Sequence, residues 1–412
     1  MEFLMSIKSN IFLVSLLAAG CLTGCIDESD DNSNIIIGSV PCGPEHAVAY
    51  SAPTLNANFI TAVHVADFGD GSNVEFIEEE AITQSSLLAA VDTDYAISGR
   101  NGHLYYLGRD QIDTLQKYYH TSPDTGLYQT DNSKGYSTRD AGQDSSPNAK
   151  MIGFINDSTA ILPRYADNKA WVVNLDAQLE SEFKICELDL SAYVTQVADD
   201  PETIEDETAI YPPNMARVDI NENYAAITMQ RLTNWATIEP AYVAIFDLAT
   251  WQEVNTNAID APLKGIELNL KNPQFSSLTG NKLYLSSVLY SDYSGGIEEV
   301  NLSTLSARVV NTESGYWDIE ATDNGNIYAI TYEGWKNNNL VQINENSRIE
   351  LGNNSGKHLI SLASRSNQLW VGTGAKETDQ PGVSIYNTTD NTLVNTITPL
   401  QRNPESITFV EK

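Results

Sequence analysis

The sequence of 412 residues is short of positive charge, histidine and cysteine, and each shortage argues against a kind of function. Lys and Arg number 23 against 55 Asp and Glu, so the net charge at pH 7 is −32. A surface of this charge repels nucleic acid phosphates, and binding to nucleic acid is therefore not expected. The five histidines and four cysteines show none of the spacings of a metal site. No cofactor and no resident metal are predicted.

Catalytic motifs and helical patterns are missing as well. No serine stands in a nucleophile elbow, and residues 352–357 miss the spacing of a phosphate-binding loop by one position. Helical periodicity is almost absent, whereas short runs rich in β-branched and aromatic residues alternate with polar turns. The pattern indicates an all-β protein without a recognisable catalytic motif.

One apolar run is present near the N-terminus, and it is too short to cross a membrane as a retained helix. Lys8 precedes an apolar stretch over 11–20, and Leu-Thr-Gly at 22–24 leads directly into Cys25. A small residue before the cysteine gives a signal peptidase access to the bond, and the thiol can carry diacylglycerol. We predict a lipoprotein signal peptide over 1–24 and lipidation of Cys25, with an ordinary secretory signal as the alternative.

The following segment, 25–45, is predicted to be a lipidated polar tether. Asp27 is the third residue after the predicted cleavage site. An acidic residue there, and not at the second position, is more compatible with export to the outer membrane than with retention at the inner one. Two or three acyl chains hold a protein firmly on a membrane. We therefore predict a lipid-anchored protein of the outer membrane, facing either the periplasm or the outside.

Cys42 and Cys186 are the cysteines that remain in the predicted mature chain besides Cys25. In an oxidising compartment such a pair can form a disulfide, which would join the N-terminal region to a distant segment. Two unrelated buried thiols are the alternative, and the sequence leaves both possibilities open.

Internal repetition is the most informative feature of the remaining chain. A similar strand motif begins at Tyr95, Tyr224 and Tyr328. A second, alternating strand that ends in Asn or Asp recurs further along, and Asn301, Asn344 and Asn387 are each 43 residues apart. Asx side chains suit these positions because they close a turn onto the backbone. A period of 40 to 50 residues with about four strands is typical of a propeller blade.

These repeats predict a single seven-bladed β-propeller over 46–412. The six complete blades are expected at 86–119, 147–191, 214–260, 275–312, 316–352 and 358–399. The seventh combines three strands within 47–77 with an innermost strand at 404–410, so that the two ends of the chain close the ring. A pair of β-sandwiches is the alternative architecture, and it does not explain the 43-residue spacing.

The body of the chain resembles the seven-bladed YVTN-type propellers of bacterial surface and periplasmic proteins. The tetrapeptide that names those repeats is absent, and Tyr328-Ala329-Ile330-Thr331 is the nearest match. Together with the motif at Cys25, the chain resembles propeller lipoproteins of outer membranes, some of which help to assemble barrels while others capture ligands for import receptors. The resemblance implies a fold, a location and an envelope protein as partner, such as an outer-membrane receptor. It implies no catalytic residues.

In a propeller, the loops that join second to third strands share one face with the connections between blades. The aromatic and basic residues expected there are candidate ligand contacts: Arg100, Arg164, Tyr165, Arg231, Trp235, Tyr290, Tyr293, Trp317, Trp335, Lys336 and Lys376. Such a rim would suit a ligand with a flat or anionic part. The alternative is that these cations balance local acidic groups. Two long connections, 119–147 and 195–213, are expected on the same face, either as a lid or docking loop or as disordered chain.

The sequence therefore predicts a lipoprotein of the outer membrane whose propeller face binds a small ligand or a partner protein without catalysis. One alternative is a structural scaffold for an envelope assembly or transport complex. Another is a propeller hydrolase or lyase, with a metal held in the central channel by Asp219, Glu320 and Glu405.

Overall fold

The computed structural model describes residues 40–54, 58–78, 81–120, 128–130, 135–197, 208–257, 261–344, 347–351 and 356–412. The predicted signal peptide, Cys25 and most of the predicted tether lie outside these described residues. Residues 37–412 form one compact unit. Within the described part of the chain, no helix has the length and apolar character needed to span a bilayer.

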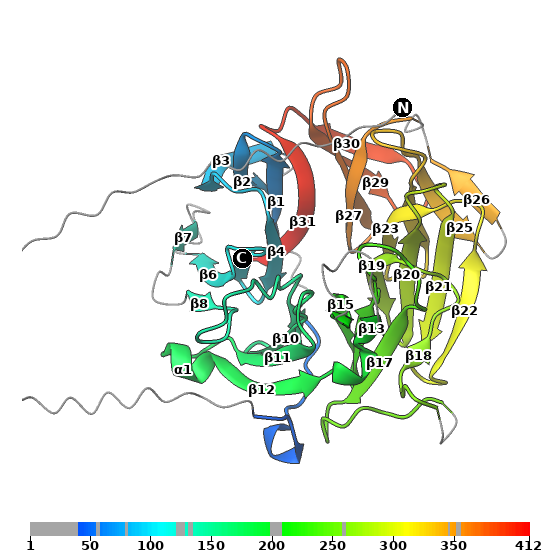
Figure 1. Cartoon of the computed structure of the whole chain (residues 1–412). Helices are drawn as coiled ribbons and strands as arrows, with labels where there is room; N and C mark the ends of the chain where they lie inside the picture. The colour runs from blue at the N-terminus through cyan, green and yellow to red at the C-terminus, as the bar shows by residue number, and fades with distance from the viewer. Residues whose placement is uncertain are drawn as a thin grey trace, which may run out of the picture. The chain divides into compact units, whose positions relative to one another are not determined.

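The described unit is a seven-bladed β-propeller, as the sequence predicts, and each blade is an antiparallel sheet with four strands in order from the axis outward, to which the first blade adds a short fifth strand (Figure 1). From the innermost strand outward, the first three blades are β4 (Tyr95–Arg100), β5 (His103–Gly108), β6 (Thr114–His120) and β7 (Tyr128–Thr130); β9 (Gly153–Phe154), β10 (Thr159–Leu162), β11 (Lys169–Asn174) and β12 (Lys184–Asp189); and β15 (Met215–Ile220), β16 (Tyr224–Met229), β17 (Tyr242–Asp247) and β18 (Ile266–Glu267).

The next three blades follow the same order along the chain. They are β19 (Pro273–Thr279), β20 (Lys282–Val288), β21 (Gly295–Asn301) and β22 (Ser306–Asn311); β23 (Tyr316–Ala321), β24 (Ile327–Thr331), β25 (Leu340–Asn344) and β26 (Ser347–Glu350); and β27 (Leu359–Arg365), β28 (Gln368–Thr373), β29 (Gly382–Asn387) and β30 (Leu393–Ile397).

The seventh blade joins the two ends of the chain and closes the ring, which confirms the prediction. Its innermost strand is β31 (Asn403–Glu411), followed outward by β1 (Phe59–Asp67), β2 (Gly71–Glu78) and β3 (Ala81–Ala90). β31 and β1 pair antiparallel from Phe59 opposite Glu411 to Ala66 opposite Asn403. β31 also contacts the innermost strands of the blades on either side, β27 and β4. No open sheet edge is therefore left between the first and last blades.

The expected composition of the first blade is wrong. The segment beginning at Tyr95 was expected to be a second strand, with the blade starting at residue 86. It is instead β4, the innermost strand, and residues 81–90 form the outer strand of the closing blade. The reason is that a half-buried alternating strand has the same pattern in either place. Of the three N-terminal strands expected within 47–77, the last one, β3, accordingly lies beyond this range.

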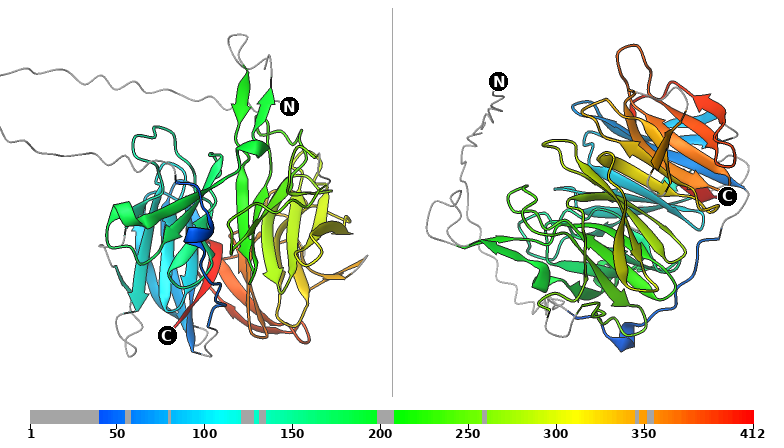
Figure 2. Two further views of the ribbon diagram at one scale, coloured as in Figure 1. Left: turned by 90° about the horizontal axis from the view of Figure 1, so that it is seen from below. Right: turned by 90° about the vertical axis from the view of Figure 1, so that its right-hand side faces the viewer.

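Smaller elements complete the fold. α1 (Glu180–Phe183) precedes β12, and the short strand β8 (Tyr136–Ser137) pairs with β6. The 3-10 helices are η1 (Pro44–His46) and η3 (Ser191–Tyr193). The connection over 195–213, expected as a lid or docking loop or as disordered chain, contains an antiparallel hairpin of β13 (Thr195–Val197) and β14 (Ala209–Tyr211). This hairpin projects beyond the neighbouring blades in the left view of Figure 2.

The core lies between adjacent blades, because successive side chains of a strand point to opposite faces of its sheet. In β16, Ala225 and Ile227 belong to the cluster shared with the second blade, whereas Ala226 belongs to the cluster shared with the fourth. Strands buried on both faces read as continuous apolar runs, which is why the repeat is visible in the sequence.

The predicted Asx turns are present between third and fourth strands. The side-chain oxygen of Asp247 accepts hydrogen bonds from the backbone N–H groups of Ala249 and Thr250, at 3.1 and 2.9 Å. Asn301 accepts equivalently from Ser303, at 2.9 Å. These contacts explain why Asn or Asp recurs at the ends of the third strands.

The N-terminal segment 40–54, which we call the strap, is attached at the second blade and runs along the ends of several blades. A disulfide joins Cys42 to Cys186 on β12, so the pairing that the sequence left open is present in the structure. The Cys42 N–H donates to the carbonyl oxygen of Glu187 at 3.0 Å, and the Ser51 N–H donates to that of Ile155 at 2.9 Å. The strap is therefore part of the folded unit.

Candidate functional site

The two faces of the propeller differ in chemistry. We call upper face the one that carries the loops between second and third strands and the connections between blades. The lower face carries the turns between first and second strands and between third and fourth strands. The strap contacts the lower face, where the indole N–H of Trp251 donates to the carbonyl oxygen of His46 at 2.9 Å. The alternation of strand direction assigns every loop to one of these faces.

Four of the predicted aromatic residues are exposed on the upper face. Trp235 and Trp335 are 79% and 70% exposed, and Tyr290 and Tyr293 are 49% and 45% exposed. Trp235 and Tyr293 also adopt positive φ angles of 63° and 60°. Bulky side chains disfavour this backbone region, so the surrounding loops must hold these residues in place.

Other exposed apolar side chains gather on the same face. Among the described residues, eight of the fifteen large hydrophobic side chains that are exposed belong to upper-face loops. Besides the four aromatics above, they are Phe68, Val91, Ile210 and Ile238. We call these eight residues the apolar rim. Several large apolar side chains exposed on one face are compatible with an interaction site.

An aromatic cluster connects the apolar rim with the propeller axis between the fourth and fifth blades. The ring centroid of Tyr332 lies 5.5 Å from that of Tyr290 and 5.6 Å from that of Tyr293. Trp317, on the innermost strand β23, lies 6.2 Å from Tyr332 and 5.5 Å from Phe275.

Sequence reasoning missed Tyr332, although it lies in the same loop as Trp335, and it missed Phe275, which lies in a strand. Tyr332 directly follows β24, and Phe275 lies within β19. A search that included the upper ends of first and second strands could have identified both residues, since side chains at these ends flank the upper-face loops.

Tyr165 and Trp235 form a second aromatic contact, between the second and third blades. Their rings are stacked with centroids 6.5 Å apart. The Tyr165 hydroxyl donates to the side-chain oxygen of Gln230 at 2.7 Å, and the side-chain amide of Gln230 donates to the carbonyl oxygen of Pro273 at 2.7 Å. These bonds tie Tyr165 rigidly to the third and fourth blades.

Most of the predicted basic residues contact protein groups rather than solvent. Arg164 is fully buried, and its guanidinium donates to Asp140 at 2.9 Å and to Gln143 at 2.7 Å. Arg231 is buried and donates to the carbonyl oxygen of Tyr193 at 3.1 Å. Both cations thus stabilise loops through carbonyl or carboxylate oxygens, in line with the alternative that they balance local groups, and their contact with a ligand stays a prediction.

Lys336 and Lys376 act in the same way at the fifth and sixth blades. The Lys336 ammonium donates to the carbonyl oxygen of Ala375 at 3.1 Å, and that of Lys376 donates to the carbonyl oxygen of Gly356. Each lysine thus connects its own loop to a neighbouring one. Their contact with a ligand stays a prediction.

Arg100 lies on the lower face, and its expected place on the upper face is wrong. It ends β4 and pairs with His103 across the turn between first and second strands. Its guanidinium donates to Asp157 at 2.8 Å and to the carbonyl oxygen of Ser51 in the strap at 2.7 Å. The error follows from the misassigned first blade. The basic residue of the corresponding upper-face loop is Arg109, which sequence reasoning missed.

Ionisable groups line the innermost strands near the axis. Lys150 and Arg109 lie at the upper ends of the second and first blades, and Arg217 lies on β15. Glu405 lies on β31 and Glu320 on β23, both solvent-accessible at least in part. Burial raises the pKa of both carboxyl groups to about 7. Cations and carboxyl groups thus both line the axis, and Glu405 lies close enough to Arg109 for the guanidinium to oppose the rise in its pKa.

The three acidic residues considered for a metal do not gather into one ligand set. Within the described residues, no group of three or more His, Cys, Asp and Glu side chains is placed to hold a metal ion. Glu320 instead accepts hydrogen bonds from the hydroxyl and N–H groups of Ser364, at 2.6 and 3.1 Å. Asp219 lies on β15 and Glu405 on β31, in different blades.

The buried carboxyl groups predict a fall in stability with rising pH. Burial raises the pKa of Asp318 and of Glu320 to about 7, so the folded chain holds protons that the unfolded chain releases above about pH 4.5. The free energy of unfolding should decrease by about 2–4 kcal/mol between pH 5 and pH 8. Urea unfolding at both pH values measures this difference.

The matched control is the double variant Asp318→Asn/Glu320→Gln, which lacks both titrating groups. Its unfolding free energy should fall much less over the same pH range, because only the raised pKa values of Asp219 and Glu405, the opposing lowered pKa of His64 and the general repulsion within the acidic chain remain. A wild-type chain that becomes more stable from pH 5 to pH 8 would contradict the assignment.

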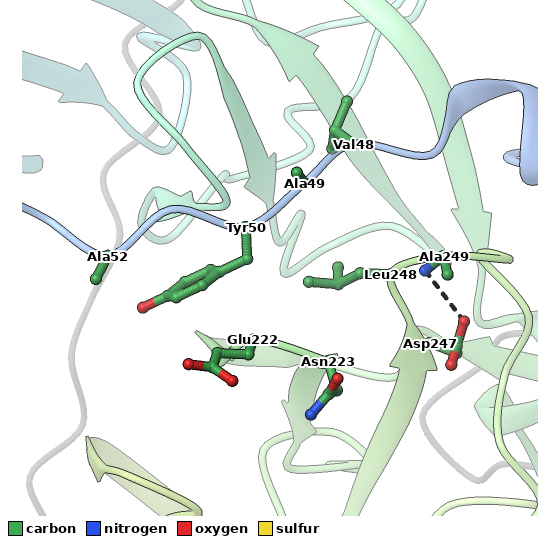
Figure 3. Close-up of a pocket in the computed structure, with 9 residues that line it drawn as sticks. All are labelled: Val48, Ala49, Tyr50, Ala52, Glu222, Asn223, Asp247, Leu248 and Ala249. Atoms are coloured by element: carbon green, nitrogen blue, oxygen red, sulfur yellow. Dashed lines mark hydrogen bonds between the residues drawn. The ribbon is translucent and has the colours of Figure 1, made fainter.

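A separate pocket of about 490 Å³ lies on the lower face, between the strap and the third blade. Figure 3 shows the Tyr50 ring of the strap above Glu222 and beside Leu248. The Asp247 carboxylate in its lining accepts a hydrogen bond from the Ala249 N–H of its own turn. No convergent set of polar groups points into it, so the upper face is the stronger candidate site.

Comparisons with known proteins support the fold. No family model and no curated protein sequence matches the chain. A protein from Lactobacillus plantarum is similar in structure, with a TM-score of 0.54 and 11% identity over 86% of this chain and 99% of that one. A putative 6-phosphogluconolactonase from Bacteroides fragilis has a TM-score of 0.53 and 12% identity over 88% of this chain and 100% of that one. At such identities the likeness shows the fold alone.

Proposed function

We propose that the chain is a lipid-anchored binding protein of the outer membrane that docks a partner protein on its upper face, without catalysis. The observation that carries the proposal is the apolar rim. Exposed Trp and Tyr side chains are enriched among the residues that dominate binding energy at protein interfaces. Their concentration on one face sets the upper face apart from the lower face and from the outer strands.

A macromolecular partner fits the rim better than a small ligand alone does. The rim residues come from the third, fourth, fifth and seventh blades and from the hairpin β13–β14, so they are spread around the mouth of the propeller. A small ligand would touch one part of this surface, whereas a protein interface of ordinary size involves 20–30 residues a side. The net charge of −32 favours a partner with a basic surface.

The proposed anchoring rests on the sequence around Cys25 and is compatible with the place of the strap. The strap is bound to the lower face through Arg100, Trp251 and the disulfide at Cys186, so the described part of the N-terminal segment leaves the upper face uncovered. A partner can then approach the rim without displacing the strap.

The double variant Trp235→Ser/Trp335→Ser should lose capture of the partner by at least tenfold. Each indole is mostly exposed, so its loss should cost little stability, whereas indoles buried at an interface contribute about 2 kcal/mol or more each. The measurement compares retention of solubilised envelope proteins on immobilised wild-type and variant chains. A folded variant that retains the same protein equally well would exclude the proposed surface.

The matched control is Leu393→Ser/Val394→Ser on the outer strand β30. These side chains are also exposed and apolar, at 54% and 49%, but lie away from the upper face. This variant should capture the partner as the wild type does. Arg164 and Arg231 are unsuitable for such a test, because both are buried and their loss would perturb the fold.

A further inference from the structure

Lys150 is a cation without a counter-ion at the upper end of the propeller axis. Its backbone N–H donates to the carbonyl oxygen of Pro163 at 3.0 Å, which fixes the residue beside the upper-face loop of the second blade. Its ammonium lies 4.6 Å from the ring centroid of Tyr165. Among the described residues, no carboxylate lies within ion-pair distance of this ammonium and no acceptor bonds it.

Arg217 of the third blade is the second cation at this place. Its guanidinium lies over the Phe275 ring, with Cζ 3.9 Å from the ring centroid. Its Nε donates to the carbonyl oxygen of Gln274 at 3.0 Å. In the described part of the chain it too has no ion pair, so two aromatic rings and one carbonyl oxygen are the main partners of these two cations.

The groups around Lys150 do not supply the missing counter-charge. Burial and the neighbouring guanidiniums of Arg109 and Arg217 lower the pKa of Lys150 to about 8, and Asp94 and Asp110 oppose this only in part. The Asp94 carboxylate is already paired with Arg109. Burial also lowers the pKa of Arg217 to about 10, although Asp318 and Asp219 attract it from deeper along the axis.

Keeping two cations together in a partly dehydrated place is unfavourable unless an anion binds there. The arrangement is conspicuous because the chain carries 55 acidic residues, and yet none pairs with Lys150 or Arg217 among the described residues. The aromatic rings of Tyr165 and Phe275 contact the two cations, and a ring face does not replace the N–H···O bonds that an anion would accept.

We propose that Lys150 and Arg217 form a binding site for the oxyanion of a small ligand, a carboxylate or a phosphate, at the upper end of the propeller axis. The anion sits between the second and third blades. The stacked rings of Tyr165 and Trp235 lie next to it and suit an apolar part of the same ligand. The site shares Trp235 with the apolar rim, but its cations do not belong to the rim, so either function can exist without the other.

The test follows Lys150 directly by NMR after reductive methylation of the lysines with ¹³C-formaldehyde. Inorganic phosphate and acetate are the two probes, since they separate phosphate from carboxylate recognition. The Lys150 signal is identified by its absence in Lys150→Met. Without a probe its pKa should be about 8, and with a bound anion the pKa should rise toward the ordinary lysine value.

Two variants provide the affinity test. Lys150→Met and Arg217→Met should each weaken binding of the effective probe by about tenfold or more, as expected for the loss of a charge-assisted hydrogen bond. Lys264→Met, which removes an exposed lysine of the lower face, should bind as the wild type does. A response to phosphate alone or to acetate alone supports the site and assigns its ligand class. A Lys150 pKa that neither probe changes would overturn the proposal, even where a variant fails to fold.

Discussion

A chain that lacks residues 403–412 should not fold cooperatively. The deletion removes β31, the innermost strand of the closing blade, and with it every backbone hydrogen bond between β31 and β1. It also opens the ring between the sixth and first blades, which leaves the edge of β1 and the buried side chains beneath it exposed to water. The loss exceeds the 5–15 kcal/mol by which ordinary domains are stable.

The contacts of β31 with its neighbours explain the size of this effect. The Ser361 hydroxyl of the sixth blade donates to the carbonyl oxygen of Pro404 at 2.8 Å, and the Gly99 N–H of the first blade donates to the Thr408 hydroxyl at 2.8 Å. Arg365 pairs with Glu411 at 3.2 Å, and both side chains are buried. β31 thus connects three blades at once.

Near-UV circular dichroism and urea unfolding measure the outcome. A milder variant, Val410→Asp, keeps the backbone of β31 but places an unpaired carboxylate at a fully buried position. It should lose about 3–5 kcal/mol of unfolding free energy. A truncated chain that unfolds at the wild-type urea concentration would show that the ring does not depend on its last strand.

Removal of the disulfide with Cys42→Ser/Cys186→Ser should lower the free energy of unfolding by about 2–5 kcal/mol. The two residues are 144 positions apart, so the bond restricts a long loop of the unfolded chain. It also holds the strap on the second blade. Without the bond, only contacts such as the hydrogen bonds from Cys42 to Glu187 and from Ser51 to Ile155 would keep the strap in place.

Thermal unfolding of the oxidised wild type, the double variant and the wild type under reducing conditions separates the bond from the substitutions. The last two should agree. Limited proteolysis should cut the strap of the double variant while the blades stay intact, because the strap then opens on its own. An unfolding free energy within 0.5 kcal/mol of the oxidised wild type would contradict the stabilising role of the bond.

Most of the fold could be predicted from the repeat of alternating strands. Strands buried between two neighbours, such as β16 and β17, recur with the blade, and the turns after Asp247 and Asn301 recur with them. The closing strand β31 could be predicted because the sequence next to it offers no further strands with which it could form a blade of its own. The first blade was not, since the pattern of β4 fits an inner strand as well as a second one.

Of the candidate site, only the exposed aromatic residues could be predicted from the sequence. Loop position suffices to place Trp235 and Trp335 on the upper face, because no strand pattern accounts for them. The sequence does not show whether a basic side chain pairs with an acidic group of the protein or stays available for a ligand. Arg164 pairs with Asp140 and with Asp167, whereas no carboxylate of the described residues pairs with Lys150, and the folded arrangement of the blades is needed to distinguish the two.

Hydroxyl-radical footprinting of the chain in its native envelope, compared with the purified chain, tests the central claim that the upper face is the functional surface. We expect protection of Trp235, Trp335, Tyr290 and Tyr293 in the envelope, with unchanged labelling of Tyr50 in the strap and Leu393 on β30. Protection confined to Tyr50 and the lower face, or equal labelling of the four aromatic residues in both samples, would contradict the account.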